Sequence, residues 1–306
     1  MKCFYHSSDM DGWCSAAIVA LTTNNYNKED YIGIDYNNHK IEDYDFSNIK
    51  DEIVYISDLS FNENNMNILI NLWKNNVEVI WNDHHDSSID LIKKYPQLDK
   101  KINGRRSKDY SGAMLTYMTL NNVTNPLDVP RAIRLVSDWD TFQHKFGDTT
   151  RYFKYGIDSD EWYCYPLSIQ WKLLLTDKIE LKVNSLIYRG KIIDDFIKID
   201  YKRYLMANAY ESKLEGVPCA VVNRSCNSLI FGELYDIYPL VSTFVYDGNK
   251  YKYSLYSKNP EVKCNKIAEG FGGGGHVGAA GFSSNELVLP FVKEINFKNK
   301  NVSEDM

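Results

Sequence analysis

The chain has 306 residues, of which 44% are hydrophobic and 25% charged, and this balance excludes a chain that is disordered throughout. Its net charge of -6 argues against extensive sequence-independent binding of long duplex DNA, which requires many lysines and arginines in contact with phosphates. The sequence has no apolar run of the roughly 20 residues that span a membrane, and its six cysteines include no CxxC pair, so we expect a cytoplasmic protein.

Residues 1–140 alternate between strand-like and helix-like segments. Short β-rich apolar runs predict strands at 2–6, 31–36, 52–57 and 77–82. Helical spacing and helix-start signals predict helices at 12–21, 63–75, 111–120 and 130–138. Because strands that alternate with helices imply right-handed βαβ units, we expect a parallel sheet with helices on its faces.

The rest of the chain predicts a long helical segment and then a second, smaller α/β block. Residues 179–214 contain no proline and have apolar residues near helical spacing, which predicts one or two long helices. The block that follows has predicted strands at 219–223, 241–246 and 251–257, and predicted helices at 229–238 and 266–271. At about 150 residues per domain, we expect an N-terminal domain at 1–178, a helical linker at 179–215 and a C-terminal domain at 216–298.

Histidine and carboxylate side chains follow the ends of predicted elements in the first 140 residues. They come after the first strand, after the third and fourth strands, and at the end of the helix at 130–138, in this order: His6, Asp9 and Asp11; Asp58; Asp83, His84 and His85; Asp138 and Asp140. In an open parallel sheet, ligands bind outside the carboxyl ends of the strands. We therefore expect these side chains to meet at one edge of the sheet.

Clustered carboxylates repel one another and lose hydration, so cations are the expected compensation. Imidazole and carboxylate together suit Mn²⁺, Co²⁺ or Zn²⁺, and Mg²⁺ if more ligands are oxygens. About six ligands exceed the needs of one ion and suit two ions that share a bridging carboxylate. Each of these segments alone has a simpler interpretation, such as a turn at 9–12 or a helix cap at Asp58. Such interpretations do not explain why all of the histidines and carboxylates lie at the ends of predicted strands or helices.

Several of these segments resemble motifs of the DHH phosphoesterase superfamily, which takes its name from Asp-His-His after an apolar strand, as at 83–85. Residues 5–12 (YHSSDMDG), 55–61 (YISDLSF) and 135–142 (LVSDWDTF) resemble the first, second and fourth motifs. Residues 271–282 (FGGGGHVGAAGF) resemble the GGGGH and AAG signature of the first type of DHH-associated C-terminal domain. The resemblance implies an N-terminal parallel-sheet α/β domain, a helical linker and a smaller C-terminal α/β domain.

The resemblance also implies roles for the residues at the sheet edge. It assigns His6, Asp9 and Asp58 to one metal ion. It assigns Asp11, His84 and Asp138 to the other, with Asp58 bridging both, and Asp140 is the alternative to Asp138 because the Asp-x-Asp pattern leaves the register open. His85 would face the scissile phosphate, and Asp83 would orient a histidine, as metal-bound imidazoles usually require.

A glycine run in the C-terminal block is the predicted substrate-binding loop. Successive glycines allow positive φ and let backbone N–H groups approach a phosphate, although such runs also occur as flexible linkers. The family often has an arginine on the preceding strand, where this chain has a tyrosine, and Arg105, Arg106, Arg224, Lys258 and Lys263 are candidates to compensate for its charge. The predicted substrate-binding residues are Gly272, Gly273, Gly274, Gly275, His276, Arg105 and Tyr256.

The resemblance implies two-metal hydrolysis of phosphoesters in short nucleotides, as in oligoribonucleases, nanoRNases and cyclic-dinucleotide phosphodiesterases. The expected cofactor is two Mn²⁺ ions, with Mg²⁺ or Co²⁺ as alternatives, and the expected substrates are oligoribonucleotides, linear or cyclic dinucleotides, and adenosine bisphosphate. We expect no membrane partner and no long duplex DNA, and a homodimer is one form of assembly known among relatives. Three alternatives remain: a polyphosphate or pyrophosphate phosphohydrolase, a non-catalytic protein that sequesters nucleotides, and a structural partner in an assembly.

Overall fold

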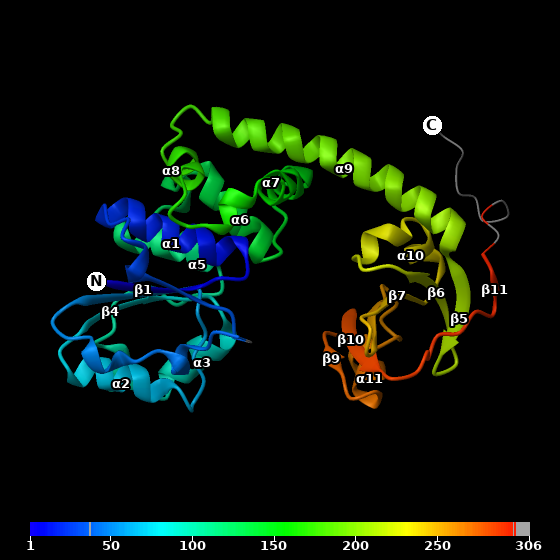
Figure 1. Cartoon of the computed structure of the whole chain (residues 1–306), viewed down its shortest axis with the longest axis horizontal. Helices are drawn as coiled ribbons and strands as arrows, with labels where there is room; N and C mark the ends of the chain where they lie inside the picture. The colour runs from blue at the N-terminus through cyan, green and yellow to red at the C-terminus, as the bar shows by residue number, and fades with distance from the viewer. Residues whose placement is uncertain (37, 296, 298–306) are drawn as a thin grey trace. The chain divides into compact units, whose positions relative to one another are not determined.

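The computed structural model describes residues 1–36, 38–295 and 297, and the chain divides into two compact units at Asp194 (Figure 1). The first unit is Met1–Asp194 and the second begins at Asp195. Each unit has its own β-sheet and its own hydrophobic cores, and the α/β class predicted from the sequence is confirmed. No helix within the described part of the chain has the length and apolar character needed to cross a membrane.

The first unit contains a parallel sheet, as the alternation of strands and helices predicts. Its strands are β1 (Lys2–His6), β2 (Tyr31–Ile34), β3 (Ile53–Ser57) and β4 (Glu78–Asn82). They are hydrogen bonded in the order β2-β1-β3-β4, and each neighbouring pair runs parallel. Because all strands run in one direction, the segments that follow them emerge at the same edge of the sheet.

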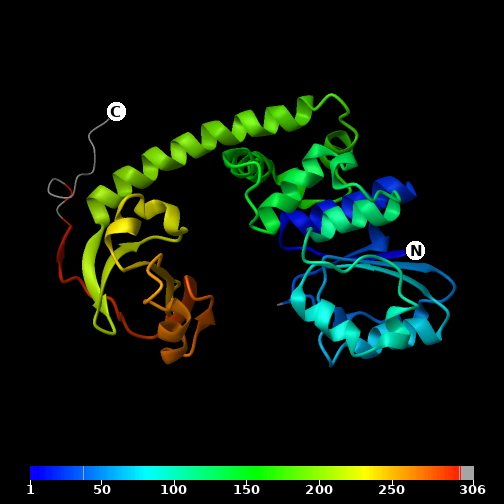
Figure 2. The same cartoon turned by 180° about the vertical axis from the view of Figure 1, so that it is seen from behind.

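Helices cover both faces of this sheet (Figures 1 and 2). One face is covered by α1 (Met10–Thr23) and α5 (Gly112–Leu120), and the other by α2 (Met66–Lys74) and α3 (Asp86–Lys93), with α4 (Pro96–Asp99) after α3. Helix α2 buries Met66, Leu69 and Leu72, which are three residues apart and therefore lie on one side of a helix. These side chains join a core with the apolar residues of β1, β3 and β4.

A helical layer outside α1 and α5 completes the first unit. It contains α6 (Arg131–Asp140), α7 (Asp148–Asp158) and α8 (Ile169–Leu175), and it shares with α1 and α5 a hydrophobic core that includes Phe153, Tyr163 and Trp171. The sequence predicted α6 two residues too short. It did not predict α7, whose apolar residues are separated by threonines, tyrosines and charged residues, or α8, which has only seven residues.

Helix α9 (Leu181–Asn208) confirms the long helix predicted from residue 179, but the prediction of helix as far as residue 214 is wrong. The chain leaves the helix after Asn208 and forms strand β5 (Tyr210–Leu214), which pairs with the next strand of the second sheet. The range expected to be a helical linker therefore contains one strand of the second sheet.

The second unit contains a mixed sheet in the order β11-β5-β6-β7-β8-β10-β9. Its remaining strands are β6 (Val217–Asn223), β7 (Leu240–Tyr246), β8 (Tyr251–Tyr256), β9 (Gly274–Gly275), β10 (Ala279–Ser284) and β11 (Lys293–Glu294). Helix α11 (Cys264–Gly270) packs on one face. The other face carries the C-terminal part of α9, a 3-10 turn at Ser228–Phe231 and α10 (Leu234–Ile237). The single helix predicted at 229–238 is thus interrupted, at Gly232, whose φ is 48°.

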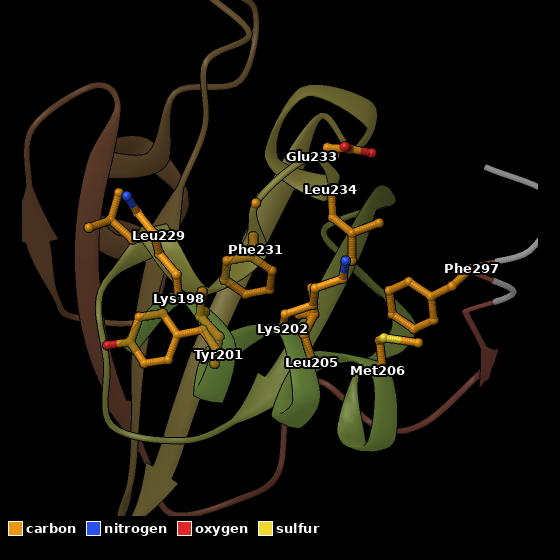
Figure 3. A pocket seen from close by; sticks show the side chains of 12 residues that line it. Lys198, Tyr201, Lys202, Leu205, Met206, Leu229, Phe231, Glu233, Leu234 and Phe297 are labelled. Carbon is orange, nitrogen blue, oxygen red and sulfur yellow. The ribbon is translucent and has the colours of Figure 1, made fainter. Parts of the chain in front are cut away.

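A cavity of about 360 Å³ lies between α9 and the segment around α10 in the second unit. Figure 3 shows side chains of α9, including Tyr201 and Leu205, near Leu229 and Phe231, with Phe297 at another side. None of the site residues predicted from the sequence lines this cavity.

Candidate metal centre

The first strand delivers His6 to the carboxyl edge of the parallel sheet, and helix α1 begins directly beside it. Asp9 caps α1, since its Oδ1 accepts a hydrogen bond from the backbone N of Gly12 at 3.0 Å. Its other oxygen lies 2.7 Å from Nδ1 of His6. Only glycine fits at position 12, because a Cβ there would lie 1.8 Å from the carbonyl oxygen of His6. The start of α1 is thereby held close to the strand end.

Asp58 follows β3 and lies between two histidines. Its φ of 57° is in the left-handed region, which few non-glycine residues adopt, although aspartate adopts it more readily than most. The backbone N of Asp58 donates to the carbonyl oxygen of Asn82 at 2.9 Å. In this position Oδ2 lies 3.5 Å from Nδ1 of His6, and Oδ1 lies 3.3 Å from Nε2 of His84. Gly112 closes the site from behind, because a Cβ there would lie 2.6 Å from the Cβ of Asp58.

His84 follows β4 and faces three carboxylates. Its Nε2 lies 3.0 Å from Oδ2 of Asp140 and 3.3 Å from Oδ1 of Asp58, in neither case with the alignment of a hydrogen bond. Asp11 uses Oδ1 to accept from the backbone N of Ala113 at 3.0 Å. Its Oδ2 is buried and has no hydrogen-bond partner, as is also true of Asp58 Oδ1 and Asp140 Oδ2.

These side chains form sets that match the ligand requirements of divalent cations. His6, Asp9 and Asp58 each bring one ligand atom within 4.8 Å of the others, and so do Asp11, His84 and Asp140. Asp58 also forms such a set with the two histidines at 84–85. Buried carboxylate oxygens without donors are costly, and a cation satisfies them. The residues present therefore fit two cations joined through Asp58.

Asp138 lies apart from this cluster, contrary to the position expected for it. Its carboxylate accepts hydrogen bonds from the backbone N of Lys145 at 2.7 Å, from that of Phe146 at 3.3 Å, and from the Thr150 hydroxyl. Helix α6 continues through Asp140 instead of ending at residue 138. Side chains two positions apart on a helix leave its axis in directions that differ by about 200°. The structure therefore places Asp140, the alternative, beside His84, while Asp138 holds the loop after α6.

His85 is held by Asp83, the acidic residue two positions before it. Nδ1 of His85 lies 2.8 Å from Oδ1 of Asp83, a fully buried residue, whereas the His85 side chain is 41% exposed. Hydrogen bonding to Asp83 raises the pKa of His85. Since Nδ1 is occupied by the carboxylate, Nε2 of His85 is the ring atom available to a ligand.

Arg105 and Arg106 lie on a segment that extends the sheet edge beside β4. The backbone of Arg105 bonds on both sides, since its N donates to Asn82 Oδ1 at 2.9 Å and its carbonyl oxygen accepts from the backbone N of Asp83. The Arg106 guanidinium contacts Asp99 at 3.0 Å and donates to the carbonyl oxygen of Trp81 at 3.0 Å. Arg106 therefore has a structural role, while Arg105 stays a predicted substrate-binding residue.

The histidines and carboxylates of the cluster shift one another's pKa values. Burial lowers the pKa of the two histidines, but the carboxylates outweigh it and raise the pKa of His6 to about 10 and of His84 to about 11. Burial likewise raises the pKa of Asp58, but the histidines outweigh it and lower that pKa to about 2. For Asp11 the balance is opposite, since burial together with Asp58 and Asp140 outweighs His84 and raises its pKa well above the usual value. The site thus requires positive charge, from protons or from cations.

The predicted substrate-binding loop forms a tight hairpin in the second unit. Gly272 and Gly275 have φ values of 75° and 142°, and a Cβ on Gly273 would lie 2.2 Å from the carbonyl oxygen of Gly281. The backbone N of His276 donates to the carbonyl oxygen of Ala279 at 2.7 Å, and the loop from 274 to 279 is exposed. The glycines therefore have a structural reason, and their part in substrate binding stays a prediction. Tyr256 lies in β8 beside Ala279.

Comparisons with known proteins place the fold. No family model and no curated protein matches the sequence. The chain is similar to the solved structure of the pGpG-specific phosphodiesterase PggH from Vibrio cholerae, with 10% identity and a TM-score of 0.51, over 93% of this chain and 92% of that one. It is also similar to a DHH domain from a member of a family of ribosomal proteins, with 13% identity and a TM-score of 0.49, over 92% of this chain and 81% of that one. For RecJ from Thermus thermophilus in complex with Mn²⁺ the values are 16% and 0.41, over 92% of this chain and 49% of that one. The chain therefore shares the fold of PggH along nearly the whole of both proteins.

Proposed function

We propose that this protein is a divalent-metal-dependent phosphoesterase that hydrolyses short nucleotides. The observation that carries the proposal is the cluster of three buried carboxylate oxygens, on Asp11, Asp58 and Asp140, which have no hydrogen-bond partner and lie with His6 and His84 at the carboxyl edge of a parallel sheet. Without bound cations, burying these carboxylates close together would be unfavourable, because each loses hydration and repels the others.

Each residue of the cluster has a separate task in this proposal. His6 and Asp9 hold one cation, Asp11, His84 and Asp140 hold the other, and Asp58 contacts both. Two cations held in this way supply Lewis acidity, which activates water and offsets the charge of phosphoryl oxygens. Asp83 keeps His85 oriented and favours its protonated form, so that Nε2–H can donate a hydrogen bond to a phosphoryl or leaving oxygen.

The choice of short nucleotides rests on the charge of the chain and on its fold. A net charge of -6 does not favour a long polyanion. PggH, whose fold the chain shares, is by its name specific for a dinucleotide. Polyphosphate and pyrophosphate are the alternative substrates, and a nucleotide-sequestering protein is the alternative without catalysis. The buried carboxylate cluster disfavours sequestration, because nucleotide binding alone does not require two cation sites.

The direct test is hydrolysis with and without metal. Purified protein with Mn²⁺ is expected to release mononucleotides or phosphate from at least one of pApA, pGpG, five-residue RNA, cyclic di-AMP and adenosine bisphosphate. Chelation should abolish this activity, and added Mn²⁺ should restore it, with Mg²⁺ no better because two imidazoles enter the ligand set. Undiminished turnover after exhaustive chelation contradicts the proposal, and activity on polyphosphate alone supports the alternative substrate.

Metal binding is expected to depend on pH through the histidines. Without metal, His6 and His84 carry protons throughout the neutral range, because their pKa values are about 10 and about 11. A histidine ligand must be neutral, so each histidine that binds displaces a proton. Between pH 6.5 and 8.5, Mn²⁺ affinity should therefore rise about tenfold per pH unit for each proton displaced. Titration calorimetry in two buffers of different ionisation enthalpy measures the proton release, and an affinity that is independent of pH would contradict this assignment.

The exposed loop of the second unit is proposed to bind a substrate phosphate through His276. His276→Ala should raise KM for a dinucleotide about tenfold or more, as expected for one charge-assisted hydrogen bond, and leave the Mn²⁺ content unchanged. His39→Ala is the matched control, because His39 is also exposed and has no predicted role. Loss of metal in the His276 variant, or an unchanged KM, would count against this role.

A further inference from the structure

A second cavity lies at the carboxyl edge of the parallel sheet, beside the candidate metal centre. Its volume is about 340 Å³, within the range of about 300–1,000 Å³ that is typical of small-molecule sites. The segments that follow β2, β3 and β4 contribute its lining, which includes Tyr36, Lys40, Glu42, Phe61, Asn62 and Ser87. The segments after β3 and β4 also supply Asp58 and His84 to the metal centre.

Tyr36 forms a wall between the cavity and the metal centre. Its ring centroid lies 5.4 Å from that of His6, and its hydroxyl accepts a hydrogen bond from the backbone N of Ser60 at 2.8 Å. Its φ of 59° is in the left-handed region, which is unfavourable for a bulky residue. The backbone of Tyr36 is thus held in an unfavourable conformation, and its ring is held by the hydrogen bond to Ser60. The residue is nevertheless 41% exposed.

The lining matches a flat heteroaromatic ring with hydrogen-bonding edges. Ile41 and Phe61 form a buried apolar floor. Polar groups lie beside it, since Asn65 Nδ2 donates to Glu42 Oε1 at 3.2 Å and both of these residues line the cavity together with Asn62. Lys40 is the single cation among the lining residues that the structure describes, which is too few for a chain of phosphates. Nucleobases stack on aromatic side chains and bond to amide and carboxylate groups, so a base fits this lining better than a phosphate does.

We propose that this cavity binds the nucleobase of the nucleotide whose phosphate lies at the metal centre, with the Tyr36 ring as its stacking surface. The inference rests on the proposed phosphoesterase function and narrows its substrate class to nucleotides instead of polyphosphate or pyrophosphate. Tyr36 connects the two sites, because its ring packs near His6 and also lines the cavity that would hold the base.

The test compares ligands with and without a base. Calorimetry with Mn²⁺ present measures the affinity of the wild type for 5′-AMP, 5′-GMP and ribose 5-phosphate, and at least one nucleotide should bind roughly tenfold tighter than the sugar phosphate. Ser87→Phe places a bulky ring in the cavity from the first turn of α3 and should remove this preference. Asp90→Phe, on the same helix but outside the lining, is the matched control and should keep it.

A second variant makes the result independent of how Ser87→Phe folds. Tyr36→Gly removes the ring and relieves the positive φ, so it should fold and should also lose the preference for the base. A base preference that survives in Tyr36→Gly and in Ser87→Phe, or a wild type without any preference, overturns the base site and leaves the proposed function standing. If the wild type shows no Mn²⁺-dependent binding of ribose 5-phosphate or of either nucleotide, the proposed function fails and the base site fails with it.

Discussion

Asp58→Asn should reduce kcat/KM by more than about 100-fold, which exceeds the 10- to 100-fold loss typical when a group behind a metal ligand is changed. Asp58 is the residue whose two oxygens face different histidines, at 3.5 Å from His6 and 3.3 Å from His84. The amide has the same size but no charge, and it offers only one oxygen. Both cation positions therefore lose a ligand in a single substitution.

The measurement is Mn²⁺ stoichiometry by calorimetry together with the hydrolysis rate. Asp90→Asn is a suitable control, because Asp90 is exposed and pairs only with Lys93 among the residues given partners in the described structure. Retention of two Mn²⁺ ions and of near-normal activity in Asp58→Asn would show that other residues hold the cations.

Asp140→Asn and Asp138→Asn should separate metal binding from stability. Burial raises the pKa of Asp140, which means that its charge is unfavourable in the metal-free protein, so the neutral amide should not lower the melting temperature. Activity should nevertheless fall more than about 100-fold, because the cation position beside His84 loses one of its proposed ligands, the carboxylate whose Oδ2 lies 3.0 Å from Nε2 of His84.

Asp138→Asn should have the opposite result. Its carboxylate accepts from two backbone N–H groups and from Thr150, so loss of the charge should lower the free energy of unfolding by about 1.5–3 kcal/mol. Mn²⁺ stoichiometry should stay at two per chain. Thermal unfolding and metal titration of both variants check the pair, and loss of metal from the Asp138 variant alone would restore the assignment made from sequence.

The parallel sheet could be predicted because its strands are short apolar runs separated by helix-length segments, and acidic residues directly follow β3 and β4, at Asp58 and Asp83. Helix α7 (Asp148–Asp158) could not, since its threonines, tyrosines and glycine have weak helix propensity and tertiary burial of Phe153 and Ile157 stabilises it. The choice between Asp138 and Asp140 depended on where α6 ends. Two more residues of helix reverse which carboxylate faces His84, and sequence patterns do not locate helix ends that finely.

Tyr36 is a residue whose position beside the metal centre was not predicted from the sequence. It lies at the end of a predicted strand and has no partner in the motifs, so its position against His6 depends on a left-handed backbone and on a hydrogen bond to Ser60. Neither feature can be predicted from the sequence, because the residues that indicate positive φ are usually glycine or asparagine. In contrast, the clustering of His6, Asp9, Asp11, Asp58 and His84 was expected, because these residues follow predicted strands whose carboxyl ends meet at one edge of a parallel sheet.

Crystals grown with Mn²⁺ and measured at the manganese absorption edge test the central claim most directly. We expect two anomalous peaks in the first unit, about 3.5–4 Å apart, one contacting His6, Asp9 and Asp58 and the other contacting Asp11, Asp58, His84 and Asp140. Absence of both peaks from this cluster, or a peak that is coordinated by Asp138 instead of Asp140, would contradict it.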